Sequence, residues 1–172
     1  KDFLNNKKKN RFGIKYPIHI SKISLLNEWY PDCKIIHLTR DPRAVYSSKS
    51  NDEFTKAIRK KYDTVEKIIR FITLIRVVFE YNWSKRVHLK HKTDENYILL
   101  RYEDLISNPE NKIKEICRFI EINFEENMLY PSGKPSSHSL KIQKGFDKNR
   151  IYIWNKKISK WEKKLIDFFS NR

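Results

Sequence analysis

Residues 33–48 of the chain read CKIIHLTRDPRAVYSS, and this stretch decides the fold class. The segment Cys33 to Thr39 is apolar and β-branched at its centre, which is typical of a strand buried in a parallel sheet. Asp41 and Pro42 are residue types preferred at the N-cap and the first turn of a helix. A buried strand that leads directly into a helix, Arg43 to about Ser50, predicts an α/β fold.

Arg40 follows this strand and is therefore expected at the carboxyl edge of the sheet, where open α/β sheets bind ligands. The next helix presents its positive N-terminus at the same edge, and Ser48 lies about two turns into that helix. A guanidinium fork and a serine hydroxyl suit a phosphate monoester. The alternative is an arginine held in an ion pair, with Ser48 as a small packing residue.

The longest helix is predicted for Asp63 to about His88. Apolar residues recur in it at steps of three and four: Val65, Ile68, Ile69, Ile72, Ile75 and Val78. This spacing places them on one helix face, and we predict that this face is buried.

Three more helices and a second strand complete the predicted fold. They are a helix Lys22–Trp29 capped by Ser21, a strand Tyr97–Leu100, a helix opened by Asn108-Pro109 and a last helix from Ser159, which has capping-box spacing to Glu162. Residues 123–150 read mostly as loop. We predict a basic lead-in over residues 1–12 and one α/β domain with a parallel sheet flanked by helices over residues 13–172.

Composition limits the classes of partner without choosing among them. The 172 residues are 39% hydrophobic, enough for one folded domain, and carry a formal net charge of +16. Such a charge attracts a nucleotide, an acidic glycan, nucleic acid or an anionic membrane, although lysines that merely solvate the surface give the same total. Cys33 and Cys117 are predicted to be small buried hydrophobes, and the histidines show no metal-ligand spacing.

The stretch from Arg40 to Ser48 resembles the 3′-phosphate motif of sulfotransferases that use 3′-phosphoadenosine 5′-phosphosulfate (PAPS). In that family an arginine ends a central strand, a serine follows eight residues later, and both bind the 3′-phosphate of the donor. The resemblance implies these roles for Arg40 and Ser48. Within the family, the sequence of residues 40–45, RDPRAV, is most similar to that of the carbohydrate sulfotransferases.

Two further segments match the family in the same order. Residues 15–19, KYPIH, resemble its Lys-Thr-Pro-Arg-His segment, which implies that Lys15 lies near the sulfonate and makes His19 a candidate catalytic base. Residues 101–105, RYEDL, followed by an Asn-Pro helix start, resemble the end of another family strand. That match implies that Tyr102 contacts the adenine end of the donor.

The resemblance covers residues 13–169 and implies a P-loop-like fold that lacks its first strand-loop-helix unit. With only three glycines and Lys1 in first place, we expect that the start of the natural protein is absent. The implied reaction moves a sulfonate from PAPS to an acceptor hydroxyl or amine, on a glycan, without a metal. The implied location is the Golgi lumen, with the cytoplasm as the alternative and a membrane anchor only if one is encoded upstream.

Two other functions fit parts of the sequence. A basic nucleic-acid-binding module would need basic residues on one face with exposed aromatics between them. Because the aromatics fall mostly in apolar stripes, we expect them in the core and predict no nucleic-acid partner. A non-catalytic remnant that binds only the 3′-phosphonucleotide is the other alternative. The sequence leaves the oligomeric state open.

Overall fold

The computed structural model describes residues 11–15, 17–51, 63–130 and 145–170. The chain divides into two units, Lys1–Cys33 and Lys34–Arg172. In the first unit, the 3₁₀ helix η1 (Pro17–Lys22) runs into α2 (Ile23–Trp29). The predicted cap Ser21 is wrong, since Lys22 holds the N-cap position and makes no side-chain hydrogen bond there. The predicted boundary at residue 12 stays a prediction.

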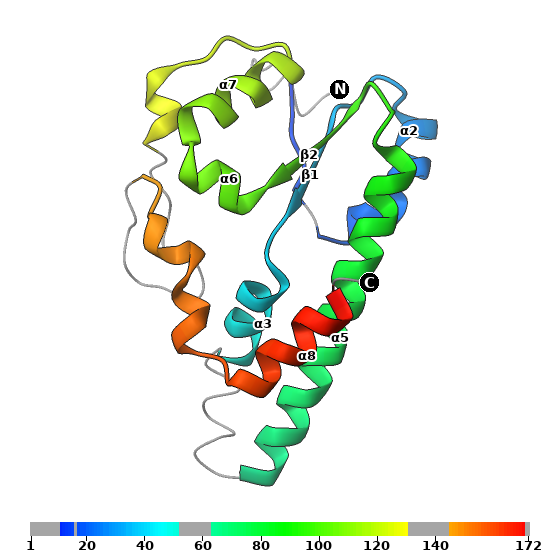
Figure 1. The fold of residues 1–172 in the computed structure, drawn as a ribbon. Coiled ribbons are helices and arrows are strands. Elements are labelled where there is room, and N and C mark those ends of the chain that lie inside the picture. The colour runs from blue at the N-terminus through cyan, green and yellow to red at the C-terminus, as the bar shows by residue number, and fades with distance from the viewer. Residues whose placement is uncertain (1–10, 16, 52–62, 131–144, 171–172) are drawn as a thin grey trace. The chain divides into compact units, whose positions relative to one another are not determined.

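The second unit confirms the α/β fold with a parallel sheet flanked by helices. Strands β1 (Ile35–Thr39) and β2 (Tyr97–Arg101) pair in parallel, with Ile35 opposite Tyr97 and Thr39 opposite Arg101 (Figure 1). The described helices of this unit are α3 (Pro42–Ser50), α5 (Asp63–His91), α6 (Tyr102–Ser107), α7 (Pro109–Phe119) and α8 (Lys160–Ser170). Short 3₁₀ helices η2 (Glu126–Leu129), η3 (Lys148–Ile151) and η4 (Ile153–Lys156) lie in and after the segment predicted as loop.

Only one face of β1 is buried, so the prediction of a fully buried strand is half wrong. His37 is 7% exposed, whereas Ile36 and Leu38, which point to the other face, are 39% and 55% exposed. In the described part of the chain, β1 has β2 as its single neighbour. The apolar sequence of β1 is therefore compatible with burial of both faces, but in this structure only one face is buried.

The core joins three helices through Tyr46 of α3, Leu74 and Val77 of α5, and Ile166 of α8. The prediction that the apolar stripe of α5 is buried is wrong: four of its members, Val65, Ile68, Ile72 and Ile75, are 43–58% exposed. The opposite face of α5 is turned inward instead.

A buried carboxylate explains why α5 takes this orientation. Glu162 of α8 is 1% exposed and accepts hydrogen bonds from Nη2 and Nε of Arg70, at 2.6 and 3.0 Å, and from the hydroxyl of Tyr46. A buried charge is tolerated when it is paired, so Arg70 must face α8, and the apolar residues on the other side of α5 then face outward.

The predicted capping box at the start of α8 is confirmed and uses the same carboxylate. The backbone N–H of Ser159 donates to Oε2 of Glu162 at 2.8 Å, and the N–H of Glu162 donates back to Oγ of Ser159 at 3.4 Å. The Asp41 cap of α3 is confirmed as well, through a 2.8 Å hydrogen bond from the N–H of Arg43. Cys117 is buried as predicted, whereas Cys33 is half-buried.

A histidine with both ring nitrogens hydrogen-bonded joins the sheet to α5. Nδ1 of His37 lies 2.5 Å from the hydroxyl of Tyr97, and its Nε2 lies 2.8 Å from Oγ of Ser84. Burial, followed by repulsion from His88, lowers the pKa of His37 from 6.5 to about 4. The folded state therefore holds this imidazole neutral under conditions in which an unfolded chain protonates it.

We expect acid to destabilise the protein through His37. Between pH 6.5 and pH 4 the unfolded chain binds the proton and the folded chain does not, so about 3 kcal/mol of unfolding free energy is lost as the pH falls through this window. Urea unfolding followed by circular dichroism from pH 7 to pH 4 measures this slope. The variant His37→Gln should have a flatter slope, and equal slopes for both proteins would contradict the assignment.

Candidate functional site

The register of the two strands brings two sequence motifs together at the carboxyl edge of the sheet. Thr39 pairs with Arg101, and Arg40 and Tyr102 are the residues that directly follow them. Arg40 and Tyr102 therefore lie side by side just beyond the ends of the two strands. One position further, Asp41 lies beside Glu103. The motifs from residue 40 and from residue 101 are thus in contact residue by residue.

The first of these contacts places a guanidinium over an aromatic ring. The Cζ atom of Arg40 lies 4.4 Å from the centre of the Tyr102 ring, a cation–π geometry that fixes the arginine side chain. The Nε of Arg40 is buried and has no hydrogen-bond partner among the described residues. A fixed guanidinium with an unused donor is a site at which an anion can bind.

The second contact holds the turn that carries Arg40. The backbone N–H of Asp41 donates to Oε1 of Glu103 at 2.9 Å, which ties the start of α3 to the start of α6. The Oε2 atom of Glu103 is buried and has no partner in the described ranges. Glu103 therefore positions the backbone next to Arg40 through Oε1. Its other carboxylate oxygen, Oε2, is a buried hydrogen-bond acceptor that is not used by the described residues.

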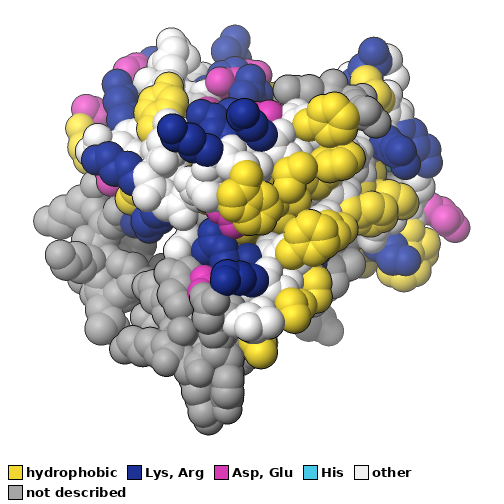
Figure 2. Space-filling view, turned by 60° about the horizontal axis from the view of Figure 1, so that its bottom comes forward, with side chains coloured by type: hydrophobic (Ala, Val, Ile, Leu, Met, Phe, Trp, Pro, Cys, Tyr) yellow, Lys and Arg dark blue, Asp and Glu magenta, His cyan; other side chains and the backbone are white. Residues whose placement is uncertain are grey.

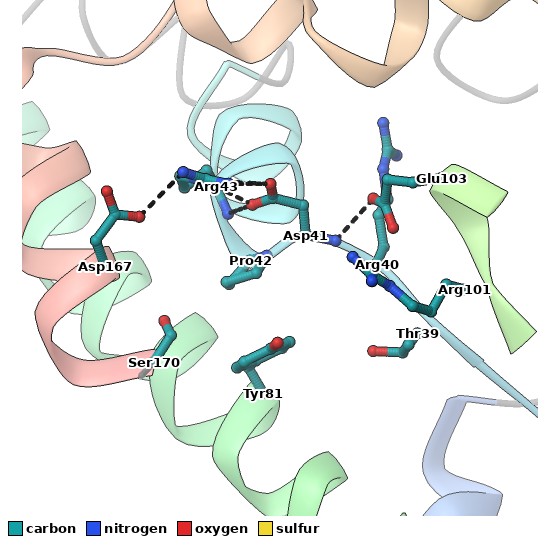
Figure 3. Close-up of a pocket in the computed structure, with 10 residues that line it drawn as sticks. All are labelled: Thr39, Arg40, Asp41, Pro42, Arg43, Tyr81, Arg101, Glu103, Asp167 and Ser170. Atoms are coloured by element: carbon teal, nitrogen blue, oxygen red, sulfur yellow. Dashed lines mark hydrogen bonds and ion pairs between the residues drawn. The ribbon is translucent and has the colours of Figure 1, made fainter. Parts of the chain in front are cut away.

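A cavity of about 120 Å³ lies at this edge (Figure 3). Its lining is largely charged and comes from the ends of both strands, the turn after β1, and helices α3, α5, α6 and α8: Thr39, Arg40, Asp41, Pro42, Arg43, Tyr81, Arg101, Glu103, Asp167 and Ser170. Three arginines thus lie around one small cavity, and only an arginine that has no ion pair within the protein leaves its positive charge available to an anionic ligand.

Arg43 is neutralised within the protein. It forms a two-point ion pair with Asp41, with Nη2–Oδ2 at 2.6 Å and Nε–Oδ1 at 2.9 Å, and a further pair with Asp167 at 3.2 Å. Its Cζ also lies 4.3 Å from the ring centre of Trp154. Arg40 and Arg101 have no ion pair within the described ranges, so these two arginines carry the available positive charge.

The structure brings together some of the residues predicted for the site and leaves others apart. Arg40 and Tyr102 are in contact, as described above. Ser48 lies on an exposed position of α3 and does not line the cavity, so its role stays a prediction. In the first unit, Lys15 is exposed, and the side chain of His19 lies outside what the structure describes.

Sequence reasoning missed Arg101 and Glu103 as members of the site. Both belong to the RYEDL stretch, in which the family resemblance implies a role for Tyr102 alone. The signal that identifies them is the strand register, which pairs this stretch with the stretch from Thr39 to Asp41. Among the described residues, no group of histidine, cysteine or acidic side chains could hold a metal ion.

Comparisons with known proteins identify the family of the chain. Residues 4–161 match the family described as the sulfotransferase domain. The chain is 32% identical over 115 residues to the omega-hydroxy-beta-dihydromenaquinone-9 sulfotransferase Stf3 of Mycobacterium bovis, which covers 62% of this chain and 28% of that protein. It is 26% identical over 106 residues to the 3-beta-hydroxysteroid sulfotransferase of Cavia porcellus, which covers 60% of this chain and 36% of that protein.

The fold has a solved counterpart. The sulfotransferase domain from the Synechococcus PCC 7002 olefin synthase superposes with a TM-score of 0.62 at 21% identity, covering 98% of this chain and 62% of that one. The chain spans about a third of the length of the two curated relatives named above, 28% and 36%. Because the family match extends over most of the chain, the protein belongs to the sulfotransferase domain family.

Proposed function

We propose that the protein transfers a sulfonate group from PAPS to an acceptor hydroxyl or amine. The observation that carries this proposal is the guanidinium of Arg40, held 4.4 Å over Tyr102 with a buried Nε that lacks a partner among the described residues. A buried donor without an acceptor is unfavourable, and a bound phosphate supplies that acceptor. Membership of the sulfotransferase domain family supports the choice of reaction.

Each site residue predicted from the sequence has a proposed part in binding the donor or in the transfer. Arg40 and the hydroxyl of Ser48 bind the 3′-phosphate, and the ring of Tyr102 packs against the adenine. Lys15 stabilises the negative charge that builds on the bridging oxygen when the sulfur–oxygen bond to the phosphate breaks. His19 accepts the proton that the acceptor group loses as its oxygen or nitrogen attacks the sulfur.

The acceptor is proposed to be an alcohol. The names of two relatives point to a terminal hydroxyl on a menaquinone and to a steroid hydroxyl, which supports a hydroxyl over an amine. A glycan acceptor and the Golgi lumen remain proposals drawn from the wording of residues 40–45. Incubation with PAPS carrying a labelled sulfonate, with a glycan, a steroid alcohol and a long-chain alcohol side by side, tests the class of acceptor. Label in the glycan alone would support the glycan, and label in the lipid alcohols alone would reject it.

We expect Tyr102→Leu to weaken the binding of 3′-phosphoadenosine 5′-phosphate about tenfold, because it removes the ring that supports both Arg40 and the adenine. Isothermal titration calorimetry measures the change in dissociation constant. Tyr102→Phe is the matched control, since it keeps the ring and should bind within about threefold of wild type. The proposed function is rejected if the folded wild-type protein binds neither this nucleotide nor PAPS.

A further inference from the structure

The outward face of α5 is a long apolar surface. Its large side chains are Val65, Ile68, Phe71, Ile72, Ile75, Phe79 and Trp83, each 43–66% exposed, and we call this set the α5 face. At about 1.5 Å per residue, Val65 to Trp83 extends about 27 Å along the helix. Soluble monomers rarely expose apolar patches larger than a few hundred Å², so the α5 face is a candidate docking surface.

The apolar surface continues onto α8. Asn82 on α5 donates a 2.8 Å hydrogen bond to the backbone oxygen of Phe169, which holds the end of α8 against α5 at the residue that precedes Trp83. Phe168 and Phe169 are 53% and 43% exposed. Figure 2 shows apolar side chains gathered in a band on this side of the molecule, bordered by Lys and Arg. Two helices therefore contribute to one surface.

The charge around the α5 face favours an anionic ligand. Beyond Trp83, the same side of the helix continues with Arg86 and Lys90, both exposed, at steps of three and four residues. The whole chain has a formal net charge of +16. Two copies that met through this face would bring like charges together, so charge complementarity disfavours a second copy and favours a negatively charged amphiphile.

The shape and chemistry of the face select among anionic ligands. Neither of two cavities in the described part of the chain, one at Arg40 and one along α7, includes a residue of the α5 face. Nucleic acid requires aromatics interleaved with cations, whereas Val65, Ile68 and Ile72 are aliphatic. A ridge of Ile, Phe and Trp followed by Arg and Lys suits the interfacial region of a bilayer.

We propose that the α5 face binds the surface of a membrane that contains anionic lipids, with α5 parallel to the membrane plane. Phe79 and Trp83 enter the boundary between headgroups and acyl chains, and Arg86 pairs with lipid phosphates. No helix in the described ranges is long and apolar enough to cross a bilayer. The surface is separate from the residues to which nucleotide binding is assigned, so its test is independent of the proposed activity.

Co-sedimentation with vesicles tests the proposal. The protein is mixed with vesicles of phosphatidylcholine alone or with phosphatidylglycerol added, and the partition coefficient is measured at low and at physiological salt. We expect binding to the anionic vesicles that weakens with salt, about a tenfold loss with Phe79→Ser and a several-fold loss with Arg86→Glu. Tyr130→Ser is the matched control: Tyr130 is 67% exposed, against 66% for Phe79, and lies outside α5 and α8.

Three outcomes overturn the proposal. One is a failure of the folded wild-type protein to bind anionic vesicles at low salt. Another is an equal loss of binding in Phe79→Ser and Tyr130→Ser, which would show that the α5 face is not the contact. The third is a concentration-dependent dimer that Phe79→Ser abolishes without vesicle binding in the wild type, which would assign the face to a second copy.

Discussion

A Glu162→Ala protein is expected to lose about 3–5 kcal/mol of unfolding free energy, the cost of removing one member of a buried ion pair. The carboxylate is 1% exposed, and its loss leaves Arg70, with a 14% exposed side chain, without its closest acceptor. It also removes the acceptor for the hydroxyl of Tyr46 and half of the capping box at Ser159. Urea unfolding at pH 7, followed by circular dichroism, measures the change.

A surface carboxylate on α5 provides the matched control. Glu80 also accepts from two cations, Lys49 at 2.7 Å and Arg76 at 2.6 Å, but its side chain is 43% exposed. Glu80→Ala should therefore cost less than about 1 kcal/mol. Equal losses of unfolding free energy for Glu80→Ala and Glu162→Ala would show that burial of the carboxylate does not increase its contribution to stability.

Acidification should reduce the difference in unfolding free energy between Glu162→Ala and the wild-type protein. Burial would raise the pKa of Glu162, but the hydrogen bonds from Tyr46, Ser159 and Arg70 outweigh it and lower that pKa below 4.5. A lowered carboxyl pKa adds stability that is fully present above the unfolded value and is lost as the pH falls through the folded one. The two proteins should therefore approach each other in stability below about pH 4.5.

Features with a local cause could be predicted from the sequence. The Asp41 cap and the capping box of Ser159 with Glu162 depend on residues two or three positions apart, and both form. Both strands begin or end within two residues of their predicted bounds, because their apolar runs are bounded by turn residues. The order of elements then leads to a parallel sheet by the usual connection rules.

Features that depend on distant partners could not be predicted. The apolar period of α5 is real, yet it does not say which face turns inward, because that choice depends on Arg70 meeting a carboxylate 92 residues away. Contact between Arg40 and Tyr102 likewise requires the strand register, which sequence spacing does not contain. The expectation that aromatics lie mostly in the core is wrong for α5 and α8, where Phe79, Trp83 and Phe168 are exposed.

The largest effect on ligand binding is expected from Arg40→Ala, which should weaken the binding of 3′-phosphoadenosine 5′-phosphate about 100-fold. The variant removes a guanidinium that is positioned by Tyr102, and two charge-assisted hydrogen bonds to a phosphate are worth about 3 kcal/mol. Arg40→Lys should recover part of the loss, since an ammonium keeps the charge but cannot form the planar two-point contact. Titration calorimetry at fixed salt measures all three dissociation constants.

Removal of a positive charge outside the cavity at Arg40 distinguishes binding of the nucleotide at a specific site from its general attraction to a positively charged protein. Arg118→Ala on α7 takes away one exposed arginine from a chain with a net charge of +16 and should change the dissociation constant less than twofold. If Arg40→Ala and Arg118→Ala weaken binding equally, the nucleotide is attracted by the overall charge and the carboxyl edge of the sheet is not its site. If Arg40→Lys binds as weakly as Arg40→Ala, the planar fork is the essential feature, because a cation alone at that position does not hold the phosphate.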